Sequence, residues 1–150
     1  MKKINVARVL LGGILAGVLM FMADGFIHSK LLHEHWMAAM KAAGRSVEAE
    51  EHGSDMIYFA AFELLRGLAV AWVYAVFRTR YGPGPKTAIC AALFLWAVMF
   101  PIFFLQEVPL GFYSTTLLTL WSLYELVPSV IAGLVAGALY KDVGVTRAIP

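Results

Sequence analysis

The sequence predicts an all-α integral membrane protein, a single domain that crosses a bilayer as a four-helix bundle. Three features predict this fold: the composition, four long apolar stretches, and the placement of basic residues between them. Of the 150 residues, 61% are hydrophobic and 15% are charged. Soluble domains are roughly 45–50% apolar and about 25% charged. A water-soluble core of this size could not hide so much apolar surface, but acyl chains can solvate it.

Four stretches are long enough to span a membrane. A helix needs about 20 mostly apolar residues to cross roughly 30 Å of hydrocarbon. We therefore expect spans at about 4–27, 56–77, 87–105 and 114–140. Helices are the expected form because lipid offers the backbone no hydrogen-bond partners. Gly- and Pro-rich breaks separate the second, third and fourth spans.

Basic residues predict the orientation, because they collect on the cytoplasmic side of bacterial membrane proteins. With four spans, one side carries Lys2, Lys3, Arg8, Arg78, Arg80, Lys86, Lys141 and Arg147. The other side carries Lys30, Lys41 and Arg45, diluted by Glu34, Glu48, Glu50, Glu51 and Asp55. We expect both termini in the cytoplasm and the segment 28–55 outside.

That outer segment has its own periodicity. Apolar residues recur at helical spacing at Leu32, Trp36, Ala39, Met40 and Ala43. This pattern predicts an amphipathic helix that either lies at the interface or continues the first span. Gly44 is a natural helix stop.

Small residues predict where the helices pack, since close approach drives association in lipid. Gly13 and Gly17 form one small-xxx-small pair, and Gly133 and Gly137 form another. Both pairs fall in the cytoplasmic half. We expect the first and fourth spans to touch there.

The second and fourth spans also resemble each other. Glu63-Leu64-Leu65 and Glu125-Leu126-Val127 open similar stretches, with the acidic residue at nearly the same depth. Either the chain is a parallel repeat of one helical hairpin or two similar helices coincide by chance.

Ionisable residues in the spans are the candidate site. Asp24, Glu63, Arg66 and Glu125 lie inside them, and His28 lies at the outer margin. Each costs about 2.5–3.5 kcal/mol on insertion scales, so such residues are functional candidates. Glu63 can reach Arg66 along the helix, and Glu125 can reach it from another helix. Such a cluster either fixes helix register, binds a ligand or ion, or carries a proton.

All four histidines, His28, His33, His35 and His52, are predicted on the outer side. Asp24, His28 and His35 are spaced four and seven apart, on one stripe of a continuous helix. With Glu107 or Glu63 they could hold zinc, copper or iron, and a single histidine could ligate haem. The spacing is no recognised metal signature, so a plain polar segment is the alternative and no cofactor is required.

Several functions are excluded. The net charge of +2 and the lack of a basic patch argue against nucleic acid. Cys90 is the single cysteine, so no intrachain disulfide can form. No phosphate-binding loop, dinucleotide fingerprint, nucleophile elbow or zinc-protease motif occurs. We therefore do not expect an enzyme.

Three segments are informative together: "LLHEHWMAAMKAAG", "RYGPGPKTA" and "WSLYELVPSVIAGLVAGALYK". With them, nearly the whole chain resembles small bacterial four-span integral membrane proteins of uncharacterised activity. It implies a four-span fold in a bacterial inner membrane and no particular activity.

Three functional hypotheses follow. The first is a non-enzymatic accessory or structural subunit of a membrane complex, whose partners are the lipid bilayer and other subunits or further copies of itself. The second is a binding or transport protein for a small ligand, ion or proton, with an outward-facing site at Asp24, His28, Glu63, Arg66 and Glu125. The third is a metal- or haem-binding module.

Overall fold

A computed structural model describes residues 4–45 and 53–142, and all regular structure in these ranges is helical. The elements in chain order are α1 Val6–Phe26, the π-helix η1 Ile27–Leu31, α2 His33–Ala42, α3 Gly53–Tyr81, α4 Pro85–Ala97, the π-helix η3 Val98–Ile102, α5 Phe103–Glu107 and α6 Thr115–Leu139. Some residues used in the orientation and metal predictions lie outside the described residues, namely Lys2, Lys3, Glu48, Glu50, Glu51, His52, Arg147 and the side chain of Asp55.

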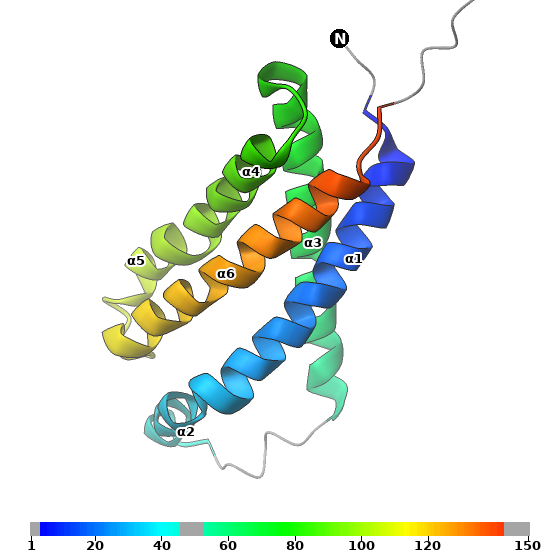
Figure 1. Cartoon of the computed structure of the whole chain (residues 1–150). Coiled ribbons are helices and arrows are strands. Elements are labelled where there is room, and N and C mark those ends of the chain that lie inside the picture. Colours follow the sequence, from blue (N-terminus) through cyan, green and yellow to red (C-terminus); the bar gives the residue numbers. More distant parts are fainter. Residues whose placement is uncertain (1–3, 46–52, 143–150) are drawn as a thin grey trace, which may run out of the picture.

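Four helical segments are long and apolar enough to cross a membrane, as predicted: Val6–Leu31, Met56–Tyr81, Pro85–Glu107 and Thr115–Leu139. The first includes η1, and the third joins α4, η3 and α5. Figure 1 shows the bundle, with α2 at one end and both ends of the described chain at the other. We call these the α2 end and the termini end.

Local sequence explains where the helices begin. The Asn5 side chain accepts a hydrogen bond from the Arg8 backbone, and Ser114 accepts one from Leu117, so both residues cap the helices that follow them. Pro85 occupies the first turn of α4, directly after Gly84 with a φ of 131°. Proline suits that place because its missing N–H would be unpaired there anyway.

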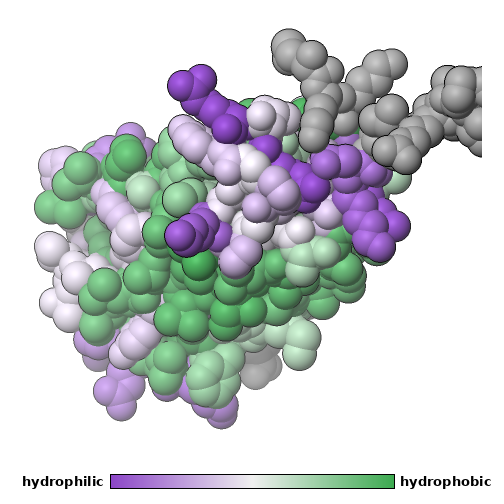
Figure 2. All heavy atoms as spheres, turned by 45° about the horizontal axis from the view of Figure 1, so that its top comes forward, coloured by the Kyte–Doolittle hydropathy of each residue, from purple (hydrophilic) through white to green (hydrophobic). Residues whose placement is uncertain are grey.

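The surface of the bundle is suited to lipid. Large apolar side chains point outward from every span, including Met22, Leu65, Leu105 and Val127, each more than 60% exposed. Figure 2 shows a broad hydrophobic belt with hydrophilic side chains toward its edges. In water such a surface would mark an aggregation-prone protein, whereas in a bilayer it is the expected exterior.

The glycine pairs lie at close helix contacts, but their partners differ from those predicted. A Cβ on Gly67 of α3 would overlap the backbone of Gly13 and Gly17 of α1. A Cβ on Gly133 would come within 2.7 Å of the Ala92 Cβ in α4, and one on Gly137 within 2.9 Å of the Ala88 Cβ.

The first and fourth spans touch in the half nearer the termini end, as predicted, but the glycine pairs do not form the contact. It lies at Gly12, where an added Cβ would lie 3.2 Å from the Ala136 backbone oxygen. A glycine motif marks a groove on its helix, but the neighbouring helix that fills the groove depends on how all four helices pack.

The amphipathic segment packs across the α2 end. Leu32 is buried with Ile27 and Leu117, and Trp36 and Ala39 pack against this group together with Tyr113, Leu120 and Trp121. The helix ends at Ala42, and Gly44 follows with a φ of 71°, in agreement with the predicted stop. The segment does not continue the first helix in a straight line, because Leu32 interrupts the helix between η1 and α2. It packs against the bundle through Leu32, Trp36 and Ala39.

Candidate functional site

The five predicted site residues lie together, in the half of the bundle nearer the α2 end. Arg66 of α3 is the centre of the group and is 4% exposed. Its Nη1 donates to Glu63 Oε1 at 2.6 Å, and its Nη2 donates to Glu125 Oε2 at 2.8 Å. Nη2 also lies 3.2 Å from Ser129 Oγ. This pattern ties α3 to α6 by charge-assisted hydrogen bonds in a dry interior.

Asp24 and His28 add α1 and η1 to the same group. The His28 Nδ1 atom lies 3.0 Å from both the backbone oxygen and the Oδ1 atom of Asp24. Only the backbone oxygen is oriented as a hydrogen-bond acceptor, so Oδ1 has an ionic neighbour but no donor. The two side chains are 13% and 27% exposed, which makes this pair the more accessible edge of the group.

The carboxyl groups outnumber the donors that reach them. Asp24, Glu63 and Glu125 can only accept hydrogen bonds when ionised, and Arg66 and His28 are the cationic groups that face them. One oxygen of each carboxylate, Asp24 Oδ1, Glu63 Oε2 and Glu125 Oε1, is buried without a hydrogen-bond partner in the described part of the chain. We call Asp24, His28, Glu63, Arg66 and Glu125 the ionic cluster.

Aromatic rings surround the ionic cluster. The Arg66 guanidinium lies 4.9 Å from the Phe100 ring centroid and 5.7 Å from that of Phe62. The His28 ring stacks on Trp36 at 5.0 Å and meets the edge of Trp121 at 5.2 Å. Rings around a cation favour the charge through their negative faces, so these contacts compensate part of the cost of burying Arg66.

Both π-helical segments supply residues here. His28 is in η1 and Phe100 is in η3, which also contains Pro101. A π-turn adds one residue to a helical turn and changes the direction of the side chains that follow, and such turns are frequent at functional sites. In this protein η1 contains the imidazole that faces Asp24, and η3 contains the aromatic ring that faces Arg66.

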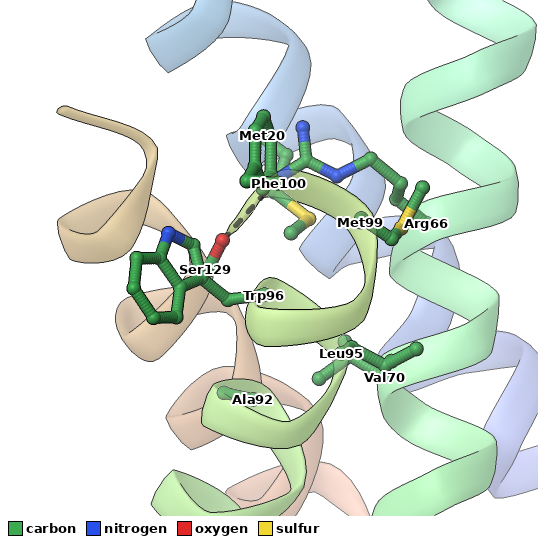
Figure 3. A pocket seen from close by; sticks show the side chains of 9 residues that line it. All are labelled: Met20, Arg66, Val70, Ala92, Leu95, Trp96, Met99, Phe100 and Ser129. Atoms are coloured by element: carbon green, nitrogen blue, oxygen red, sulfur yellow. Dashed lines mark hydrogen bonds between the residues drawn. The ribbon is translucent and has the colours of Figure 1, made fainter. Parts of the chain in front are cut away.

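The space beside Arg66 is small. Figure 3 shows the cavity between α1, α3, α6 and the α4–η3 segment, with Arg66 reaching across to Ser129 next to Met20 and Phe100. The lining is otherwise apolar, and the cavity has room for about one water molecule. The Arg66 side of the ionic cluster is therefore closely packed, whereas Asp24 and His28 form its accessible edge.

Toward the termini end, the described residues include no buried carboxylate, guanidinium or imidazole group. Buried residues beyond Arg66 are mainly small or apolar, including Val70, Ala71, Ala92 and Ala132. The next polar groups within the described chain are Tyr74, which accepts from Arg78, and the Arg78–Asp142 pair at 2.9 Å. The ionic cluster thus has an edge toward the α2 end and a packed apolar layer on its other side.

The predicted metal site is not assembled. Within 4–45 and 53–142, no three His, Cys, Asp or Glu side chains are placed to hold a metal ion. The prediction assumed one continuous helix through Asp24, His28 and His35. Because η1 has a different period and Leu32 has a non-helical φ of −113°, His35 does not continue that stripe.

Sequence reasoning missed Ser129 and the aromatic rings. Ser129 is 3% exposed and lies four residues after Glu125, on the same helical face, so its spacing was a usable signal. The ring contacts of His28 depend on how α2 folds back, and no local pattern indicated them.

Comparison with known proteins adds no identity: no family model, curated protein or solved structure matches this chain.

Proposed function

We propose that this membrane protein binds a proton, or a small monovalent cation in its place, at the ionic cluster, and that it is not an enzyme. The observation that carries the proposal is the surplus of carboxyl groups. Asp24, Glu63 and Glu125 face one guanidinium and one imidazole, and each has a buried oxygen that no donor of the described residues reaches. Even with His28 protonated, one negative charge is left uncompensated.

An uncompensated charge in this position is costly. Burying an ion in a protein carries an effective penalty of several kcal/mol, which a partner must offset. Glu63 and Glu125 are 1% and 0% exposed, so water does not offset it. A proton on one of the carboxyls removes the uncompensated charge and supplies a missing donor.

The same geometry favours binding over transport. A transported ion needs access from both sides of the bundle. His28 and Asp24 offer an approach from the α2 end, whereas the described residues beyond Arg66 form a packed apolar layer. We therefore propose uptake and release at one side only.

We further propose that the protein lies in a bacterial inner membrane with both termini in the cytoplasm, so that the α2 end faces outward. The support is the distribution of basic residues. In a Cys90→Ala background, Lys41→Cys of α2 should react with a membrane-impermeant maleimide on intact cells. Lys141→Cys should react only after the cells are opened, and the reverse pattern would refute this orientation.

Infrared spectroscopy tests the proposed site directly. The purified protein in lipid nanodiscs should show the C=O band of a protonated carboxyl group, shifted in D2O. The band should disappear in Asp24→Asn and in Glu125→Gln. It should persist in Glu34→Gln, which changes an exposed residue of α2 and serves as the matched control.

Two results would count against the site. A missing band, together with thermal stability independent of Na⁺ and K⁺, would leave the ionic cluster with a register-fixing role alone. Net proton or cation flux in proteoliposomes would show that the apolar layer opens, and it would replace one-sided binding with transport.

A role as accessory subunit of a membrane assembly is the second candidate, supported by the first turns of α3. Met56, Ile57, Tyr58 and Phe59 are each more than 50% exposed, so this apolar stretch has no packed face of its own. A helix that is apolar all round is covered by lipid or by protein, and these turns leave every face free for a partner helix. Photo-crosslinking from Tyr58 in native membranes should capture a defined protein, and crosslinks to lipid alone would argue against a subunit role.

A further inference from the structure

A second site lies on the outside of the bundle, where α1 and η1 run along α6. A groove of about 320 Å³ opens there to the surroundings. Its walls are Ala23, Phe26, Ile27 and Leu31 on one side and Leu123, Tyr124, Val127 and Pro128 on the other. The groove is separate from the cavity beside Arg66, because the two share no residue.

The groove is almost entirely apolar, and it lies on the surface of the first and fourth spans that would face the acyl chains of the bilayer. From Leu31 to Ala23 it extends over about 12 Å at a helical rise of 1.5 Å per residue. Leu31 is the last residue of the first span, so the groove begins at the membrane boundary and runs inward from it. This direction is that of an acyl chain entering from the interface.

A cationic residue adjoins the outer end of the groove in the chain. Lys30 is exposed and directly precedes Leu31, the wall residue at the end of the span. No ion pair involves Lys30 in the described part of the chain. At the end of a span, its ammonium group is at the height of lipid phosphates.

We propose that this groove is a binding site for an anionic phospholipid, with one acyl chain between α1 and α6 and the phosphate on Lys30. A phospholipid matches both features at once, since it offers an apolar chain and an anion a fixed distance apart. A helix from a second copy could fill the groove but would leave Lys30 without an anion.

Lipid-dependent stability tests the site. Delipidated protein in detergent is heated with phosphatidylglycerol or with phosphatidylcholine of the same acyl chains. Phosphatidylglycerol should raise the Tm of the wild type at about fivefold lower concentration, the effect expected of one basic side chain. Lys30→Ala should lose this preference, whereas Lys41→Ala, an exposed lysine of α2, should keep it.

The groove itself is tested by filling it. Val127→Trp should reduce the number of phospholipids retained in native mass spectrometry by one, and Ile131→Trp, on the exposed surface one turn away, should not. Wild-type lipid retention in both Lys30→Ala and Val127→Trp would overturn the proposal. A change of oligomeric state in Val127→Trp would also overturn it, and would assign the groove to contact between copies.

Discussion

The two halves of this bundle are held together by different forces. Near the α2 end, ion pairs of the ionic cluster join α3 to α6 under aromatic rings, and some carboxylate oxygens have no donor within the described residues. Near the termini end, glycines and alanines bring the backbones into contact, and the Arg78–Asp142 pair is partly exposed. Packing of small residues stabilises one helix arrangement without any titratable group. Buried charges stabilise an arrangement only in one protonation state or with a particular ligand bound.

Removing the Arg66 guanidinium should have the largest effect on stability. It therefore tests the difference between the two halves most clearly. Arg66→Met leaves Glu63 and Glu125 buried without their shared partner. We expect a loss of about 3–5 kcal/mol of unfolding free energy, measured by denaturant titration in mixed micelles. A triple variant that adds Glu63→Gln and Glu125→Gln should recover most of it. A loss below about 1 kcal/mol in Arg66→Met would mean that the ionic cluster is not buried as described.

A methyl group at the crossing of α1 and α3 should come next. This crossing borders the ionic cluster, because Gly67 directly follows Arg66 in α3. Gly67→Ala places a Cβ against the backbone of Gly13 and Gly17, which can move only if α1 and α3 separate. Overpacking of this kind costs about 1–3 kcal/mol, again measured as the free energy of unfolding. Gly25→Ala is the matched control, since no atom lies within 4 Å of its added Cβ. Equal stability of the two variants would contradict the close crossing of α1 and α3.

Removing the N-cap of α6 should lower the unfolding free energy by less, and this loss should not depend on the ionic cluster. Ser114 Oγ accepts from the Leu117 backbone N–H at 3.1 Å. Ser114→Ala should lower the unfolding free energy by about 1 kcal/mol, and Ser114→Asp should preserve it. If the loss in Ser114→Ala changes when Arg66→Met is also present, the α2 end folds as one coupled unit and the cap is not a local feature.

The smallest effect is expected at the exposed ion pair of the termini end. Asp142→Asn weakens the contact with Arg78, and the Asp142 side chain is 41% exposed. We expect about 0.2–1 kcal/mol, with the difference from wild type shrinking at high salt. The loss in Arg66→Met should hardly respond to salt, because that cluster is buried. Similar salt dependence at both ion pairs would remove the contrast between the two halves.

Much of the candidate site could be predicted from the sequence, because ionisable residues are rare in apolar spans. Asp24, Glu63, Arg66 and Glu125 stand out in apolar spans, and a lone buried cation must find anions at its own depth. Ser129 could have been found from its helical spacing to Glu125. The aromatic contacts and the groove beside Lys30 could not, since they require the positions of η1, α2 and α6 relative to one another.

The sequence by itself determined the four spans, the helical class and the grouping of the charged residues. These depend on quantities that belong to each residue, namely the free energy of moving its side chain or its peptide group from water to hydrocarbon. Only the tertiary structure decided that Gly13 and Gly17 meet Gly67, that His35 leaves the stripe of His28, and that a groove opens between α1 and α6. Those outcomes depend on shape matching between helices far apart in the chain, where differences of an ångström decide which surfaces fit.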